Sequence, residues 1–401
     1  MTDVPTRDAF RFEYDPATIR YGSGAVADLG AELDAQGFER ALVVCGRTVG
    51  ETPAVMDPVR AGLDDRLAGV FAETTPDKRL ATAADAAAAM RDHDADVLVA
   101  VGGGSSLDVA KLAAVLAGGR DPGDAGRELA DSGTVSVADP VAPIVAVPTT
   151  LAGADLSQVA GVTAAPDGGL VEEPVSGGVS DPRLMPRAAV YDPALFATTP
   201  ESVLRGSAMN GFDKGVETLY AATATPITDA TAARGLGLLV DGLRELGERG
   251  AEPAVLEPVV QGIVLVQYGI SRPGETTLSL IHAFGHGLTA HSDLQQGVAH
   301  GVIAPHALRY LFERVDGRRD RLADALGVGD AADPAAAVVE RVAAVRDALG
   351  LPATLDEAGG PDPEQFPAVA EAVVADSFMA NAPPGLEATA DDIEAVLHEA
   401  A

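Results

Sequence analysis

Residues 97–111 read VLVAVGGGSSLDVAK, and this stretch decides the fold. Its first part, Val97–Val101, is a continuous apolar run rich in β-branched residues, which is typical of a strand buried on both faces of a parallel sheet. Ala41–Cys45 and Ile144–Val147 are runs of the same kind, and the alanine-rich segment Leu80–Arg91 favours a helix. This alternation predicts an open α/β domain with a parallel sheet and helices on both faces.

From about Arg187 the pattern changes to helical spacing without strand-like alternation. The segments with this spacing are Val203–Ala222, Ile227–Glu248, Leu256–Ser271, Glu275–Thr289 and Ala299–Phe312. A length of 401 residues also favours two cores over one. We therefore predict an α/β domain over residues 1–187 and an all-α domain over residues 188–401, with a hinge in the glycine- and proline-rich stretch Ala165–Pro186.

The charge balance excludes some classes of partner. Asp and Glu total 60 against 28 Lys and Arg, which gives a formal net charge of -32. Such a surface repels phosphate backbones and anionic lipid, so we expect neither nucleic acid nor a membrane as a partner. Lysine occurs only at Lys78, Lys111 and Lys214, and this acidic, lysine-poor composition indicates a halophilic protein whose self-repulsion is screened by very high salt.

We expect a cytoplasmic location. Cys45 is the only cysteine, which excludes an intramolecular disulfide and a thiolate metal cluster. Residues 1–10 lack the basic start and apolar run of a secretory signal, and no apolar stretch approaches the roughly 20 residues that span a bilayer.

A phosphate-binding loop follows the central apolar run. Gly102, Gly103 and Gly104 allow the backbone to turn sharply and approach a ligand, while Ser105 and Ser106 could cap a helix whose first amides face a pyrophosphate. Asp108 and Lys111, one turn further on, strengthen this interpretation. A glycine turn with a capped helix and no ligand is the alternative.

The predicted helical domain holds five of the seven histidines, at positions 282, 286, 291, 300 and 306. His282 and His286 lie four residues apart in LIHAFGHGL, so they share one helix face, as metal binding or proton transfer requires. A structural role for the pair is the alternative.

Together these motifs resemble the iron-containing (group III) alcohol dehydrogenases, relatives of dehydroquinate synthase and glycerol dehydrogenase. The resemblance covers nearly the whole chain and rests on GGGSxxDxAK at 102–111, Tyr21–Gly24, Val147–Thr150, Tyr191–Pro193 and the stretch from His282. It implies a dehydroquinate synthase-like fold, in which NAD(P) meets a small-molecule substrate between the two domains. It also implies a homodimer or a higher homo-oligomer.

The resemblance also implies which residues bind the nucleotide. Gly102 to Ser106 would hold the pyrophosphate, and Thr149 and Thr150 would line the nicotinamide side. Thr149 opens the segment TTLAGADLS, which contains Leu156 and is similar to a segment of maleylacetate reductases, the branch that looks closest.

Gly46 stands where many relatives have an Asp that binds the adenosine ribose, and Arg47 follows it. A guanidinium in place of a carboxylate favours a 2′-phosphate, so we expect NADP in preference to NAD. A solvated loop position for Arg47 is the alternative.

The family's metal ligands are largely replaced. An ungapped alignment of MNGFDKGVETLY at 209–220 places Asn210 and Lys214 at the first two ligand positions, and His282 and Gln296 occupy the other two. Lysine brings a positive charge and no lone pair at neutral pH, so we predict no catalytic iron or zinc. A shifted register would offer Asp213, Glu217 and His282 instead.

We therefore predict hydride transfer between a nicotinamide and a small alcohol, carbonyl or enone, with maleylacetate reduction as one possibility. Lys214 and His282 would replace the metal electrostatically, Asn210 and Gln296 would hydrogen-bond the substrate, and His286 would relay a proton.

Several alternatives stay open. Lys214 could instead form a surface ion pair with an acid such as Asp213. The protein as a whole could be a metal-dependent dehydrogenase with the shifted ligand set, a dehydroquinate synthase-like lyase, or a nucleotide-binding regulator without catalysis.

Overall fold

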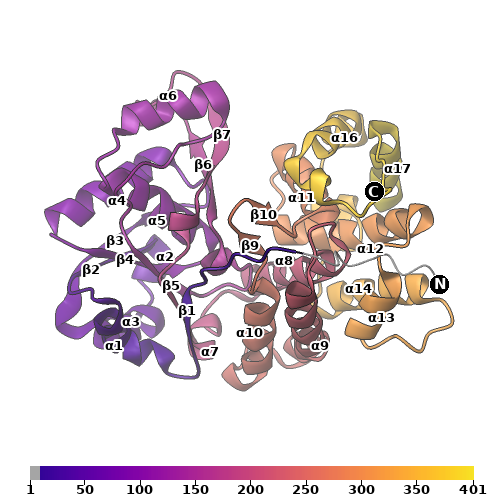
Figure 1. Cartoon of the computed structure of the whole chain (residues 1–401), viewed down its shortest axis with the longest axis horizontal. Helices are drawn as coiled ribbons and strands as arrows, with labels where there is room; N and C mark the ends of the chain where they lie inside the picture. The colour runs from indigo at the N-terminus through magenta and orange to yellow at the C-terminus, as the bar shows by residue number, and fades with distance from the viewer. Residues whose placement is uncertain (1–9) are drawn as a thin grey trace. The chain divides into compact units, whose positions relative to one another are not determined.

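The structure is a computed structural model that describes residues 10–401. The described chain forms two compact units, residues 14–199 and residues 200–401 with 10–13 (Figure 1). The first unit ends twelve residues later than the predicted boundary at 187, because strand β8 (Ala188–Tyr191) pairs with other strands of the first unit.

A six-stranded parallel sheet forms the centre of the first unit, as predicted. In spatial order its strands are β1 (Thr18–Tyr21), β8, β5 (Ile144–Pro148), β4 (Val97–Gly102), β2 (Ala41–Gly46) and β3 (Leu67–Thr74). The three predicted apolar runs are the central strands β2, β4 and β5, whose side chains are buried. The sheet is flanked by α1 (Leu29–Gln36), α2 (Arg47–Gly50), α3 (Pro53–Leu63), α4 (Leu80–Asp92) and α5 (Gly104–Ala117).

The strand order reverses between β2 and β4. From β2 the chain adds β3 on one side, and it then returns to place β4, β5 and β8 on the other side. The strand ends Gly46, Gly102 and Pro148 therefore lie at one edge of the sheet. In open parallel sheets, the carboxyl ends of the strands at such a switch point are where ligands bind.

An antiparallel hairpin, β6 (Val159–Ala164) and β7 (Val175–Ser180), occupies most of the stretch predicted as a hinge. The hinge prediction is wrong because the glycines there serve close packing. A Cβ atom on Gly177 would overlap the carbonyl oxygen of Gly133, just after α6 (Pro122–Ser132). The hairpin is thus fixed within the first unit.

The second unit is mainly helical, as predicted. Its helices are α8 (Glu201–Tyr220), α9 (Pro226–Arg249), α10 (Pro253–Gln267), α11 (Leu280–Ala290), α12 (Gln296–Arg314), α13 (Arg319–Ala325), α14 (Pro334–Ala348), α15 (Leu355–Ala358), α16 (Phe366–Ala375) and α17 (Ala390–Ala400); a short α7 (Pro193–Phe196) closes the first unit. The predicted helix 275–289 starts late, because Glu275–Thr276 pairs with Ser271–Arg272 as strands β10 and β9.

Close backbone packing aligns the helices that carry the site. A Cβ atom on Gly297, at the start of α12, would overlap the carbonyl oxygen of Gly206 in α8. The side chains that α8 and α12 direct inward are consequently brought close together.

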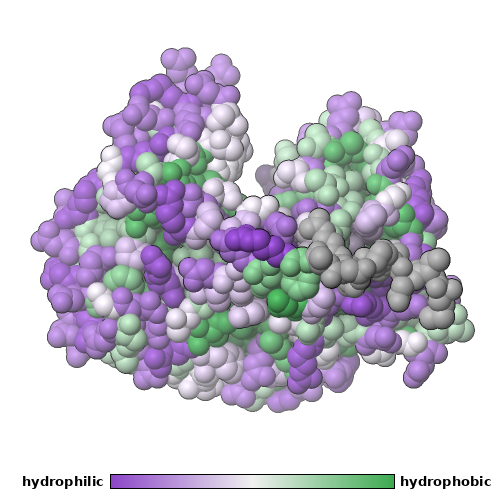
Figure 2. All heavy atoms as spheres, viewed as in Figure 1, coloured by the Kyte–Doolittle hydropathy of each residue, from purple (hydrophilic) through white to green (hydrophobic). Residues whose placement is uncertain are grey.

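The surface agrees with the charge balance. Hydrophilic side chains cover much of the face of each unit drawn in Figure 2, which fits the net charge of -32. Within residues 10–401, no helix has both the length and the apolar character that crossing a bilayer demands.

Candidate active site

The glycine loop joins β4 to α5 at the reversal point of the sheet. Gly102 has φ 136°, a conformation that favours glycine, and α5 begins directly afterwards at Gly104. A Cβ atom on Gly103 would lie 3.0 Å from Cγ2 of Thr150, so the backbone passes close to that side chain.

The two serines of the loop do not cap the helix, contrary to the prediction. Gly103 takes the N-cap position, so Ser105 and Ser106 lie inside the first turn, and Oγ of Ser106 is 2.9 Å from Oγ1 of Thr74. Among residues 10–401 no side chain caps α5. The N–H groups of Ser106 and Leu107 donate to the carbonyl oxygen of Gly103, and those of Gly104 and Ser105 before them are available to an anionic ligand. The loop therefore fits a pyrophosphate.

Asp108 and Lys111 hold the hairpin against α5. The buried ammonium of Lys111 donates to the carbonyl oxygens of Ala154 and Val159, at 2.8 and 3.0 Å. Oδ2 of Asp108 accepts the N–H of Gly161 at 3.2 Å and lies 2.6 Å from Nζ of Lys78. These contacts give Asp108 and Lys111 a structural role, while nucleotide binding by either residue stays a prediction.

Leu156 is also part of the packed interior, since its side chain is only 2% exposed, and so it offers almost no surface to a nucleotide. It ends the short turn Ala154–Leu156. Thr149, by contrast, donates its N–H to the carbonyl oxygen of Gly102 at 3.0 Å, and Thr150 beside it is partly exposed. Both threonines therefore border the glycine loop.

Gly46 and Arg47 lie at the same edge of the sheet. Gly46 pairs with Thr74, and a Cβ atom at position 46 would lie 3.2 Å from the Thr74 carbonyl oxygen, so a larger side chain is crowded there. Arg47 is exposed and, within residues 10–401, forms no ion pair with an acid. Its guanidinium is available to an anionic ligand.

Three helices bring the predicted catalytic residues together. Asn210 and Lys214 are one turn apart on α8, and His282 and His286 are one turn apart on α11. Burial and the neighbouring charge of Lys214 hold the pKa of His282 well below its usual value, so this imidazole is neutral.

Gln296 begins α12 and lies beside α11. Its Cγ would be 3.6 Å from a Cβ atom on Gly285, a residue located between the two histidines. All five predicted catalytic residues thus lie on three helices, α8, α11 and α12, and Gln296 is beside Gly285 of α11.

Glu217 orients His282, a contact that the sequence indicated only as a metal alternative. Oε2 of Glu217 is 2.5 Å from Nδ1 of His282, and its Oε1 accepts the backbone N–H of His282 at 3.0 Å. Because Nδ1–H donates to the carboxylate, Nε2 keeps its lone pair, and it has no hydrogen-bond partner among residues 10–401. Burial raises the pKa of Glu217 to about 7.

Asp213 and His300 extend this buried group. Nδ1 of His300 is 3.7 Å from Oδ2 of Asp213, and the rings of His300 and His282 meet edge to face with centroids 4.4 Å apart. Burial raises the pKa of Asp213 and lowers that of His300, which favours the neutral form of both. No role was predicted for His300; its spacing of four residues from Gln296, on the same helix, is the signal that points to it.

The residues present do not fit a divalent metal. The four positions that the resemblance equates with ligands carry two amides, an ammonium and one imidazole, and an ammonium repels a cation. In the shifted set, the carboxylate of Glu217 is already bonded to Nδ1 of His282 at 2.5 Å. In the described part of the chain, no three His, Cys, Asp or Glu side chains are arranged to hold a metal ion.

His286 has its own carboxylate partner, which no pattern in the sequence indicates. Nδ1 of His286 is 2.8 Å from Oδ2 of Asp376, the residue that follows α16. The ring of Phe378 packs on His286 with centroids 5.2 Å apart, and the imidazole remains 45% exposed. His286 is thus both oriented and open to solvent.

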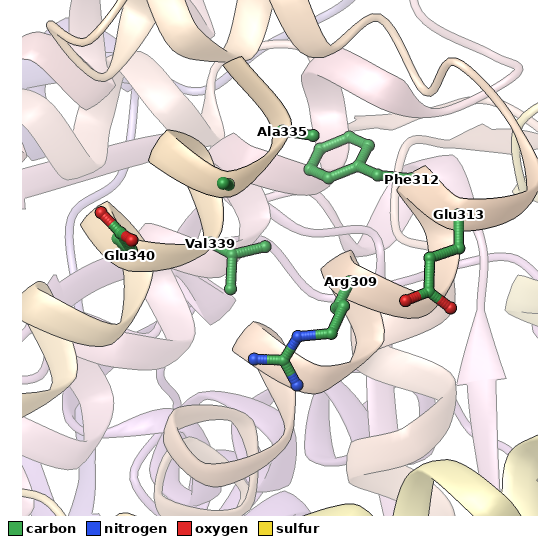
Figure 3. Close-up of a pocket in the computed structure, with 7 residues that line it drawn as sticks. Arg309, Phe312, Glu313, Ala335, Val339 and Glu340 are labelled. Atoms are coloured by element: carbon green, nitrogen blue, oxygen red, sulfur yellow. The ribbon is translucent and has the colours of Figure 1, made fainter. Parts of the chain in front are cut away.

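A separate pocket of about 340 Å³ lies between α12 and α14 (Figure 3). It is lined by Arg309, Phe312, Glu313, Ala335, Ala336, Val339 and Glu340. None of the predicted site residues lines it, so we do not assign it to the active site.

Comparison with known proteins covers both units. The sequence profile of the iron-containing alcohol dehydrogenases matches residues 16–193, and the profile of the C-terminal domain of the Fe-containing alcohol dehydrogenase family matches residues 206–401. Maleylacetate reductase of Burkholderia cepacia is 29% identical over 354 residues, which is 88% of each chain. The NAD-dependent methanol dehydrogenase of Bacillus methanolicus is 28% identical over 335 residues, 82% of this chain and 83% of that enzyme.

The solved structures agree on the fold. The crystal structure of maleylacetate reductase from Agrobacterium tumefaciens covers 98% of both chains, with a TM-score of 0.78 and 23% identity.

Proposed function

Because the chain belongs to the iron-containing alcohol dehydrogenase family and is an NAD(P)-dependent oxidoreductase, we propose that it reduces a small enone or carbonyl compound without a catalytic metal. The likeness to maleylacetate reductases favours a conjugated keto-dicarboxylate as the substrate. The observation that carries the proposal is Lys214, whose charge acts on His282 and which occupies a position where the resemblance places a metal ligand.

The glycine loop would hold the nucleotide pyrophosphate at the start of α5, with Thr149 and Thr150 on its nicotinamide side. When bound, the nicotinamide supplies the hydride that reduces the substrate.

The side chains of the helical unit manage charge and the proton. As hydride adds to the enone or carbonyl carbon, an electron pair moves onto the substrate oxygen, and the Lys214 ammonium stabilises that negative charge. Asn210 and Gln296 hydrogen-bond the polar groups of the substrate. His286 gives up the proton that completes the reduction and is re-protonated from solvent, to which it is exposed.

His282 acts in this scheme as a neutral group. Its Nε2 carries a lone pair and accepts a hydrogen bond, because Glu217 holds the proton on Nδ1. The positive charge is thereby assigned to Lys214.

We further propose that Arg47 selects NADP(H) by contacting the 2′-phosphate. Replacing Arg47 by Ala should raise the KM for NADPH on the order of tenfold or more and leave the KM for NADH unchanged. Arg91→Ala, at an exposed arginine at the end of α4, is the matched control. Equal effects on both nucleotides would contradict this preference.

Lys214→Met tests the central proposal. The enzyme is purified in high salt and assayed at 340 nm with NADPH and NADH against maleylacetate and simple aldehydes. The substitution should lower kcat on the order of 10²- to 10³-fold and leave nucleotide binding intact. Arg244→Met, at an exposed arginine on α9, should have no effect. Unchanged kcat in Lys214→Met would remove Lys214 from the site.

Metal analysis of the active enzyme tests the second part. We expect no stoichiometric iron or zinc and full activity after dialysis against a chelator. Activity that requires a bound metal would instead support the shifted ligand set.

We also propose that the enzyme works in a salt-rich cytoplasm and that it is a homodimer or a higher homo-oligomer. Light scattering after size-exclusion chromatography would measure the oligomeric state.

A further inference from the structure

Asp376 links two parts of the helical unit through one carboxylate. Its Oδ1 accepts the N–H of Phe378 at 2.8 Å and so caps the turn Ser377–Asn381, while its Oδ2 is 2.8 Å from Nδ1 of His286. The two oxygens therefore have separate partners, one in the backbone and one in an imidazole.

The turn that carries Asp376 is fixed over α11. Asn381, at its far end, donates from Nδ2 to the carbonyl oxygen of Leu278 at 2.7 Å, and its own carbonyl oxygen accepts the N–H of Ala222 at 2.9 Å. The Phe378 ring packs on His286 and contacts His282 edge to face, with centroids 6.2 Å apart. The turn is thus held at both ends.

We propose that Asp376 is a positioning residue for His286, an inference that rests on the proposed function. The carboxylate accepts Nδ1–H, which leaves Nε2 as the nitrogen that exchanges a proton with the substrate. Because the imidazole is 45% exposed, packing alone does not hold it, and Asp376 supplies the missing constraint.

The charge state of Asp376 agrees with this role. Burial raises the pKa of Asp376, but the hydrogen bonds from His286 and from the Phe378 amide more than offset it, so the net shift is downward. At neutral pH the residue is therefore an acceptor-only carboxylate. It also stabilises the positive charge that His286 carries when both ring nitrogens are protonated.

Asp376→Asn separates the cap from the contact with the imidazole. The amide oxygen can still accept the Phe378 N–H, but the amide NH₂ then faces Nδ1 and favours the tautomer protonated at Nε2. We expect kcat to fall on the order of 10²-fold with little change in the KM for the nucleotide, and Asp376→Glu to recover part of the loss.

The matched control is Asp333→Asn. Asp333 caps α14 by accepting the Ala336 N–H at 3.1 Å, and no histidine within residues 10–401 forms a hydrogen bond or ion pair with it. This substitution should leave kcat unchanged. A loss equal to that in Asp376→Asn would show that removing an Asp cap is itself harmful and would overturn the inference.

The tautomer itself gives a readout that does not depend on activity. In alkaline buffer, ¹⁵N-histidine spectra should show His286, assigned by its loss in His286→Gln, protonated at Nδ1 in the native protein and at Nε2 in Asp376→Asn. An unchanged tautomer with unchanged kcat overturns the inference. Full activity of His286→Gln would instead contradict the proposed function, whatever the spectra show.

Discussion

The carboxylate of Glu217 holds His282 at two points, the ring Nδ1 at 2.5 Å and the backbone N–H at 3.0 Å. Both residues are buried, and they come from different helices, α8 and α11. This double contact sets the rotation of the imidazole and the nitrogen that it presents.

Glu217→Gln should lower both stability and turnover. The Gln amide oxygen can still accept the backbone N–H, but the NH₂ then faces Nδ1 and moves the ring proton to Nε2, which is buried without a partner among residues 10–401. This should cost about 1–3 kcal/mol in the free energy of unfolding. Denaturant unfolding monitored by circular dichroism measures this. Tyr220→Phe removes the hydrogen bonds of the Tyr220 hydroxyl, among them the 3.2 Å bond to Oε1 of Glu217, but it leaves both contacts of Glu217 with His282 in place and should cost less. Equal stability of Glu217→Gln and the wild type would contradict the assignment.

Two glycine-to-alanine substitutions in helices should change stability in opposite directions. A Cβ atom on Gly285 would overlap the His300 ring, so Gly285→Ala should destabilise the protein by about 1–3 kcal/mol. Gly237 on α9 is exposed, and its nearest neighbour would be 4.0 Å from the new Cβ atom. Gly237→Ala should stabilise by about 0.5–1 kcal/mol, because alanine favours the helix. Thermal unfolding of the wild type and both variants in the same buffer shows whether Tm falls for Gly285→Ala and rises for Gly237→Ala.

Acid should destabilise the helical unit partly through His306. Burial, with the nearby charges of Arg309 and Arg346, lowers the pKa of His306 to about 4, below the usual value of 6.5. The unfolded chain therefore takes up the proton first. Stability from this group is complete above pH 6.5 and is lost as the pH falls towards and through 4.

Replacing His306 by Gln removes this titration. Between pH 7 and pH 4 the variant should lose less stability than the wild type, by about 1 kcal/mol after allowing for partial exposure. His282 and His300, whose pKa values burial also lowers, still titrate in both proteins. At pH 8 the His306 ring is neutral, so unfolding curves of the wild type and the variant at this pH measure the difference in packing between the ring and the Gln amide. That difference is subtracted from the values at lower pH. Parallel stability profiles would contradict the role of His306.

Salt should stabilise the protein. With a net charge of -32, raising KCl from about 0.1 M to about 3 M screens the self-repulsion and should raise Tm. A series in sucrose, which does not screen charge, separates this effect from general exclusion of solutes. A Tm that is equal or lower in high KCl would argue against a halophilic protein.

The sequence predicted the central strands because burial on both faces leaves an unmistakable pattern. Val97–Val101 is apolar without interruption, whereas the edge strands β1 and β3 are partly exposed and the glycine-rich β7 has few side chains to pack. The same glycines suggested a hinge, since a sequence does not distinguish a glycine kept for flexibility from one kept for close contact.

Part of the site could be found from spacing along one helix. His282 and His286 share a face of α11, and that local periodicity is visible in the sequence. Asp376 lies 90 residues beyond His286 and reaches it only through tertiary packing, so no sequence pattern indicates the pair. The sequence predicted that Ser105 and Ser106 cap the helix, but α5 begins at Gly104 and its cap is Gly103. A shift of one or two residues in the start of a helix changes its cap, and the sequence does not fix that start.

The anchoring of the hairpin to α5 gives the first unit a mechanical link. Opening the hairpin would separate Lys111 from the carbonyl oxygen of Val159 and Asp108 from the N–H of Gly161, so the two elements should unfold together. In hydrogen exchange, the amides of Val159–Ala164 and those of α5 should be released at the same free energy. A nucleotide that stabilises the start of α5 would then slow hydrogen exchange throughout the hairpin. Mass spectrometry would detect nucleotide binding as slower exchange of the hairpin amides.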